Sequence, residues 1–332
     1  HLSRAGFYRG LESFPLNGGQ NPLPSPDYNL RHKKVTDICV VETASLGTFA
    51  CIVEEDAGLR IVDVTNPDRP ALVNTIEEDV RTVATYQDLV IYSTYPNILT
   101  IASIVSGQGD MSTLATFACP DAMLVKDLFV EDDFLYVAQV ICGMLIYDLS
   151  DPHQPEHLST LCDTTNMGPI FSVSVSGYFA YLTGLYGVFV VDITDRAHPE
   201  LIQKITGYGQ KCTSFASNGF CLILPNMVNG IEVFDTFAPY GPGGVQFVAD
   251  FSLPNWPADV AIEGNVAVAT MIYAGQYLAE KYLIFYDISD LGNVTAFKKH
   301  YFLPGFNHGL EIKNGYIYVT DEESLLDVLK ME

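Results

Sequence analysis

The chain has 332 residues, of which 48% are hydrophobic, so it is long enough to bury a sizeable core. Its 40 acidic residues outnumber its 17 Lys and Arg residues, and the formal net charge of −23 excludes nucleic acid as a partner, because binding a phosphate backbone requires clustered cations. No uncharged apolar run reaches the length of about 18 residues that a membrane-spanning helix needs, so we expect no transmembrane segment.

Residues 35–77 read as one structural unit of four short strands with turns between them. The predicted strands are 35–41, 48–53, 59–64 and 71–76. Turn residues such as Ser45-Leu46-Gly47 and Asn66-Pro67 separate them. Short β-rich runs separated by such turn residues predict an antiparallel meander.

Two features of this unit recur along the chain. The first is a short apolar strand that ends in aspartate, with clear copies at 59–63, 144–148, 188–192, 231–235 and 283–287. The second is a polar residue in the first strand, at Asp37, Thr82, Asp127, Ser172, Thr213 and Asp259, with Gly309 at the corresponding place of the last unit. Seven such positions, 41 to 50 residues apart, predict an all-β fold: a seven-bladed β-propeller of four-stranded antiparallel blades.

The last unit supplies only three strands before Glu332. We therefore expect the segment before Val35 to supply the fourth strand and to close the ring. Residues 35–332 then form a single propeller domain, and residues 1–34 form an N-terminal arm. The alternative is that residues 1–30 form a loose arm.

The phrase Leu59-Arg60-Ile61-Val62-Asp63, followed by Asn66-Pro67 and Pro70, resembles the LVIVD repeat. The resemblance extends over roughly residues 35–327. It is strong in the first, third and fourth units and weaker in the second, where Ser103 replaces the aspartate. It implies a propeller of the kind found in bacterial and archaeal exported or cell-surface proteins. It brings no catalytic residue with it.

The polar first-strand positions offer a candidate cation site. Propeller inner strands run beside the central channel, so Asp37, Asp127 and Asp259 are the carboxylates that could hold Ca²⁺, a cation that prefers several oxygen ligands. The alternative is structural, with each polar side chain bonding backbone N–H groups where the blade begins. We expect no other cofactor.

We predict a structural role for the aspartate that ends each signature strand. Asp63, Asp148, Asp192, Asp235, Asp287 and Asp327 recur just before a predicted turn. An aspartate in that place can accept hydrogen bonds from the amides of the turn. We therefore predict that these residues define the blades and bind no ligand.

His308 departs from the repeat. It stands beside the channel position of the last unit, and Arg81 and Lys126 occupy the same place in units two and three. With Asp127 they could recognise an anionic ligand or perform acid–base chemistry. The alternative is that each is simply a solvated side chain.

The seven cysteines form no CxxC pair, and most lie within apolar strand runs. That placement favours buried thiols, with one or more disulfides as the alternative. An odd count leaves at least one thiol unpaired within a single chain.

The sequence contains no GxSxG, HExxH or P-loop motif. We expect a non-catalytic binding module, secreted, periplasmic or at the cell surface, that contacts a protein or other ligand across one propeller face near the long loops 239–244 and 274–281. The chain starts at His1 and not at Met, which also favours a processed, exported protein. The alternatives are a hydrolase or lyase with its site near His308, and a structural subunit of a surface assembly. The sequence predicts no oligomeric state.

Overall fold

The computed structural model describes residues 11–15, 35–120, 124–141, 143–207, 214–226, 230–237, 243–251, 256–272, 282–301, 307–321 and 325–331. Within these ranges the chain forms β-strands, turns and one short 3-10 helix, η2 (Leu291–Asn293). No helix in these ranges is long and apolar enough to cross a membrane.

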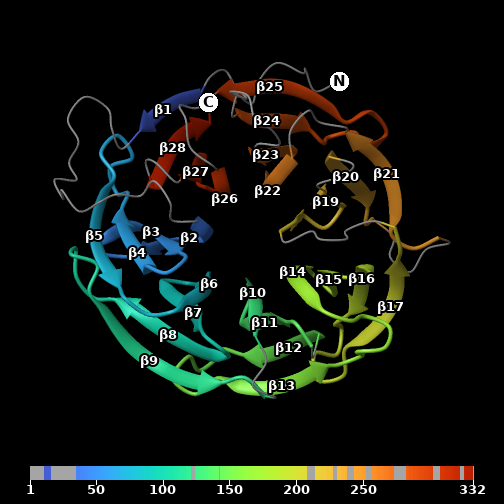
Figure 1. Ribbon diagram of the computed structural model, residues 1–332, viewed down its shortest axis with the longest axis horizontal. Helices are drawn as coiled ribbons and strands as arrows, with labels where there is room; N and C mark the ends of the chain where they lie inside the picture. The colour runs from blue at the N-terminus through green and yellow to red at the C-terminus, as the bar shows by residue number, and fades with distance from the viewer. Residues whose placement is uncertain are drawn as a thin grey trace.

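The strands form four-stranded antiparallel sheets that radiate as seven blades around a central opening (Figure 1). Blade one contains β2 (Val35–Thr43), β3 (Gly47–Glu54), β4 (Gly58–Asp63) and β5 (Ala71–Ile76). Blade two contains β6 (Val80–Tyr86), β7 (Leu89–Thr94), β8 (Ile98–Ile104) and β9 (Met111–Ala118). Blade three contains β10 (Val125–Glu131), β11 (Phe134–Gln139), β12 (Gly143–Asp148) and β13 (Glu156–Leu161). Blade four contains β14 (Ile170–Ser176), β15 (Phe179–Gly184), β16 (Gly187–Asp192) and β17 (Glu200–Ile205).

The remaining blades follow the same order from the channel to the rim. Blade five contains β18 (Ala216–Ser217), β19 (Cys221–Asn226), β20 (Gly230–Asp235) and β21 (Gln246–Phe251). Blade six contains β22 (Trp256–Glu263), β23 (Val266–Ile272), β24 (Tyr282–Asp287) and β25 (Thr295–Tyr301). Blade seven contains β26 (Asn307–Lys313), β27 (Tyr316–Asp321), β28 (Leu325–Met331) and β1 (Leu11–Pro15). The predicted fold class is confirmed.

The two ends of the chain meet in blade seven. Strand β1 pairs antiparallel with β28, from Leu11 opposite Met331 to Pro15 opposite Asp327. It lies on the rim, where the other blades place their own fourth strand (Figure 1). The predicted closing strand is therefore present.

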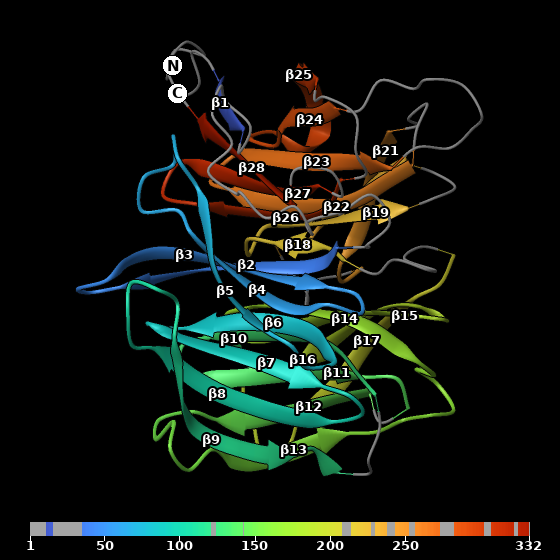
Figure 2. The ribbon, with the colours of Figure 1, turned by 60° about the vertical axis from the view of Figure 1, so that its left-hand side comes forward.

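The antiparallel order gives the ring two different faces (Figure 2). We call one the link face, because it carries the links between blades and the turns between second and third strands. The opposite face, which we call the signature face, carries the other turns of each blade. Our expectation that one face bears both long loops is wrong: the loop at 239–244 follows the third strand of its blade and the loop at 274–281 follows the second, so their flanking strands open on opposite faces. Most of both loops lies outside the described residues.

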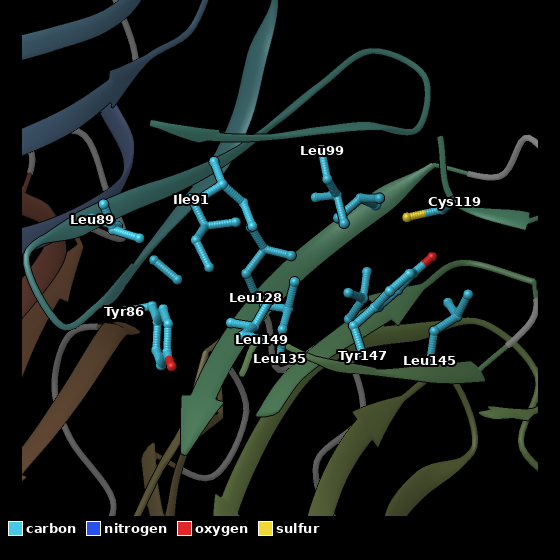
Figure 3. Close-up of a cluster of buried hydrophobic side chains, with 14 residues drawn as sticks. Tyr86, Leu89, Ile91, Leu99, Cys119, Leu128, Leu135, Leu145, Tyr147 and Leu149 are labelled. Carbon is cyan, nitrogen blue, oxygen red and sulfur yellow. The ribbon is translucent and has the colours of Figure 1, made fainter. Parts of the chain in front are cut away.

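The hydrophobic core is divided among the junctions between blades. Each cluster of buried side chains draws on two neighbouring blades. Figure 3 shows the junction of blades two and three, where Ile91 and Leu99 pack toward Leu135 and Tyr147. Because each sheet is apolar on both faces, no blade can bury its surface alone, and the ring must close.

The signature aspartates cap the turns that follow them, as predicted. Five of them accept a hydrogen bond at Oδ1 from the backbone N–H two residues later. The pairs are Asp63 with Thr65 (2.9 Å), Asp148 with Ser150 (2.7 Å), Asp192 with Thr194 (2.8 Å), Asp235 with Phe237 (2.8 Å) and Asp287 with Ser289 (3.0 Å). Asp327 differs, since it lies within β28.

We expect Asp192→Ala to lower the free energy of unfolding by about 1 kcal/mol, because it removes the acceptor for the Thr194 N–H in an otherwise intact turn. Chemical denaturation measures the change. Asp88→Ala, an exposed turn residue of blade two, is the control and should change stability by less than about 0.5 kcal/mol. Equal effects of the two substitutions would contradict the capping role.

Candidate functional site

The inner strand of each blade has an unpaired edge that faces the channel. N–H groups on such an edge need partners other than a neighbouring strand. In six blades of the described structure the ladder between first and second strands shifts register at the same place. The shifts lie between Val35 and Asp37, Val80 and Thr82, Val125 and Asp127, Ile170 and Ser172, Pro257 and Val260, and Asn307 and Leu310. A β-bulge re-aims side chains, and here it falls at the polar first-strand position.

Asp37 shows what this arrangement achieves. Its Oδ2 atom accepts hydrogen bonds from Thr82 Oγ1 at 2.6 Å and from the Val83 N–H at 2.9 Å, both in the next blade. Its Oδ1 atom accepts the N–H of Ile38 at 2.8 Å. One carboxylate thus joins blade one to blade two and satisfies an amide on each side of the junction.

Asp127 repeats the arrangement between blades three and four. Ser172 Oγ and the Val173 N–H donate to its Oδ2 atom, the latter at 2.9 Å. The Leu128 N–H donates to Oδ1 at 2.8 Å. Carboxylate and hydroxyl therefore alternate along the first four blades, so that each aspartate finds a donor in the following blade.

Asp259 departs from this pattern because the ring has an odd number of blades. Its Oδ1 atom accepts from Ser214 Oγ of the preceding blade, and its Oδ2 atom accepts the Leu310 N–H of the following blade at 2.7 Å. Thr213, the position that the spacing indicated, lies outside the described residues. Gly309 has no side chain to offer, and a β-carbon there would lie 3.1 Å from Ile38 Cγ2 of blade one.

These carboxylates line a central cavity of about 740 Å³. Glu311 of β26 joins them there, a residue that the sequence analysis did not single out. Burial within the channel wall raises the pKa of Asp37 to about 6 and the pKa values of Asp127, Asp259 and Glu311 to about 7. Hydrogen bonds oppose this effect for the three aspartates, and the Lys313 charge opposes it for Glu311.

The candidate Ca²⁺ ligands are the same three aspartates. Both oxygens of each accept hydrogen bonds from protein donors, which is the structural alternative that the sequence left open. Where the chain is described, no three His, Cys, Asp or Glu side chains are grouped as metal ligands. The ring of aspartates therefore has a structural role, and Ca²⁺ binding stays a prediction.

The predicted charged cluster occupies the bulges. Arg81 and Lys126 are the extra residues of β6 and β10, and both line the channel together with Asp127. Arg81 is tied to Asp79, with Nη2 2.7 Å from Oδ2, and its guanidinium lies 5.5 Å from the ring centre of Tyr95. His308 lies at the start of β26, at the corresponding bulge, and its side chain falls outside what the structure describes.

The described cysteines are all free thiols. Cys39, Cys51, Cys119 and Cys221 are buried, whereas Cys162 is exposed. Cys39 and Cys51 lie opposite each other on β2 and β3, and burial together with Cys51 raises the pKa of the Cys39 thiol. The four buried thiols act as small apolar side chains.

The link face exposes large apolar side chains in one recurring place. The turn between second and third strands carries Tyr95 in blade two, Ile141 in blade three, and Leu185 and Tyr186 in blade four, with exposed fractions of 42–60%. We call these four residues the apolar arc. The signature face also exposes large apolar side chains. Val105 and Phe237 lie in the turns between third and fourth strands of blades two and five, and Tyr178 lies in the turn between first and second strands of blade four.

We expect Asp127→Asn to lower the free energy of unfolding by about 2 kcal/mol, because an amide keeps only one acceptor oxygen and its NH2 group would face the N–H donor of either Leu128 or Val173. Denaturant unfolding measures the loss. The matched control is Asp88→Asn, which removes the same charge from an exposed turn and should change little. Similar stabilities of the two variants would rule out the bridging role of Asp127.

We expect Glu311→Gln to stabilise the protein at pH 8 and to have no effect at pH 4. The pKa of Glu311 is raised on folding, so the stability that its protonated form provides is present below the ordinary pKa of 4.5 and lost as the pH rises through about 7. Glutamine is neutral throughout, and the gain at pH 8 is on the order of 2 kcal/mol. Unfolding curves across this range measure it, with exposed Glu156→Gln as the control. Parallel profiles for wild type and Glu311→Gln would contradict the assignment.

The comparisons with known proteins agree with this architecture. The family model described as LVIVD repeat matches residues 40–77, 124–164 and 168–206. No curated protein matches the chain. The WD40 domain of Pan2 from Neurospora crassa is 12% identical and has a TM-score of 0.68, with 98% of this chain and 94% of that chain covered. The computationally designed protein Ika8 is 10% identical and has a TM-score of 0.60, with 90% and 96% covered.

Identities this low show a shared fold and nothing about function. The three matched segments correspond to the first, third and fourth blades, where the resemblance was strongest. The chain is thus a seven-bladed β-propeller with LVIVD repeats in blades one, three and four.

Proposed function

We propose that the protein is a non-catalytic binding module that contacts a protein partner across its link face. The observation that carries this proposal is the apolar arc, which places exposed side chains at the same turn of three consecutive blades. Exposed apolar side chains that recur at the same turn of neighbouring blades favour association with another protein. The LVIVD repeats support a binding or structural role.

The side chains at the channel mouth support binding over catalysis. The carboxylate of Asp127 accepts hydrogen bonds at both oxygens, and Arg81 is paired with Asp79. Groups engaged in this way serve the scaffold, whereas acid–base chemistry needs a group within reach of a substrate proton. We further propose an extracytoplasmic location, which the LVIVD resemblance suggests. Protease accessibility of the protein on intact source cells tests that location.

Selection of random peptides against the immobilised protein tests the binding face. We expect enriched peptides to bind at least about 10-fold more weakly to Tyr95→Ser/Ile141→Ser, because the substitutions remove apolar contact area from the link face. Fluorescence anisotropy measures the affinities. Tyr178→Ser/Val105→Ser removes comparable exposed side chains from the signature face and is the control. Absence of enrichment, or dependence on the signature face, would refute the proposal.

A further inference from the structure

A second cavity opens on the link face where blade one meets blade two. It has a volume of about 390 Å³ and lies between the turn that joins β3 to β4 and the link from β5 to β6. It is lined by Asp56, Ala57, Arg60, Thr75, Glu77, Glu78 and Asp79. We call it the acidic pocket.

The single cation of this lining is already neutralised. Arg60 Nε lies 2.6 Å from Glu54 Oε2, and Arg60 Nη1 donates to Thr75 Oγ1 at 2.9 Å. The Glu54 side chain is fully buried, and its second oxygen, Oε1, accepts no hydrogen bond from the described residues. The base of the pocket thus contributes no net positive charge.

The remaining carboxylates have no structural task within the described residues. Asp56, Glu77 and Glu78 are exposed and form no hydrogen bond or ion pair there through their carboxylates, while Asp79 pairs with Arg81. The signature aspartates differ, because residues such as Asp192 and Asp235 cap turns. Unpaired like charges held around one pocket repel each other, and a cation placed among them relieves that repulsion.

The acidic pocket adjoins the first residue of the apolar arc. The Tyr95 N–H donates to the carbonyl oxygen of Asp79 at 3.0 Å, so the first aromatic residue of the arc is fixed at the rim of the pocket. Its ring is 60% exposed and already lies near one guanidinium, that of Arg81. Ile141 and Tyr186 occupy the same turn in the next two blades.

We propose that the link face binds a basic segment of a partner protein, with Lys or Arg side chains in the acidic pocket and adjoining apolar side chains on the arc. This inference rests on the proposed function and adds the chemistry of the partner. The net charge of −23 favours a cationic partner over an acidic one, and an aromatic ring at the rim favours a cation that can lie over its face.

The test uses a fluorescein-labelled peptide of about twelve residues that carries three arginines at one end and Leu-Tyr-Leu at the other. We expect saturable binding to the full-length protein. Asp56→Asn/Glu77→Gln/Glu78→Gln should raise the dissociation constant by about 10-fold, because it removes the charges that the arginines meet. A peptide with glutamates in place of the arginines should not bind.

A matched variant separates the pocket from the overall charge. Asp68→Asn/Asp88→Asn/Asp132→Asn removes the same number of carboxylates from exposed positions on the signature face. Asp56 and Asp132 also share a left-handed backbone, with φ of 64° and 53°, which asparagine tolerates. This variant should change the dissociation constant by less than about twofold.

Equal losses in the two variants, or no saturable binding of the arginine peptide, would overturn the assignment of a basic partner. Neither result affects the test of the binding face, because the random peptides used there are selected without regard to charge. If those peptides still require the apolar arc, the binding module stands and only the chemistry of its partner is wrong.

Discussion

The structure depends on how the inner edge of each blade is satisfied. A propeller leaves one edge of every inner strand facing a channel, and the backbone amides there need partners that the ladder cannot supply. Asp37 and Asp127 provide them, because a bulge turns each carboxylate toward the following blade, where it accepts one backbone and one hydroxyl hydrogen bond. A single side chain thereby solves a local problem of the strand and joins two blades.

Bridging by aspartates constrains which residue type can occupy the channel position of each blade. Carboxylate and hydroxyl must alternate, and an odd number of blades breaks the alternation, so Asp259 bonds on both sides and Gly309 allows a close approach to blade one. Other junctions use different contacts, such as Tyr86 with Asp133 between blades two and three and Lys313 with the Val40 carbonyl between blades seven and one.

Burying several carboxylates around one channel raises their pKa values toward neutrality, so the contacts that close the ring also make its stability sensitive to pH.

Periodic features of the chain were predictable because each copy supports the others. The signature strand and its capping aspartate revealed the blade count, the fold, and the three segments that match the LVIVD repeat. The closing strand followed from counting strands, and it lies at Leu11–Pro15 within the segment before Val35.

Contacts between units were not predictable from their spacing. Nothing in the sequence around Asp37 says that its partner is Thr82, because only closure of the ring brings the two strands together. The channel position of Glu311 was not predictable either. Glu311 lies between Leu310 and Ile312 in an apolar strand, and only the structure shows that this strand borders the channel. The length of the two long loops does not reveal their face, which depends on whether a loop follows the second or the third strand of its blade.

The acidic residues fall into two groups with different tasks. The aspartates of the channel wall and of the signature strands accept hydrogen bonds that define blades and turns, whereas Asp56, Glu77 and Glu78 of the acidic pocket face solvent. The scaffold is thus carried by residues that recur from blade to blade, whereas the proposed binding of a basic segment depends on carboxylates that lie in one pocket.

The bridge between blades can be tested most directly by the exchange of three backbone amides in the wild-type protein. Val83, Val173 and Leu310 donate their N–H groups to aspartates of a neighbouring blade on a strand edge that faces the channel. We expect these amides to exchange with deuterium only through global unfolding, as slowly as amides in the middle of the sheets. Exchange as rapid as that of unbonded amides on the rim strands would show that the aspartates do not hold the blades together.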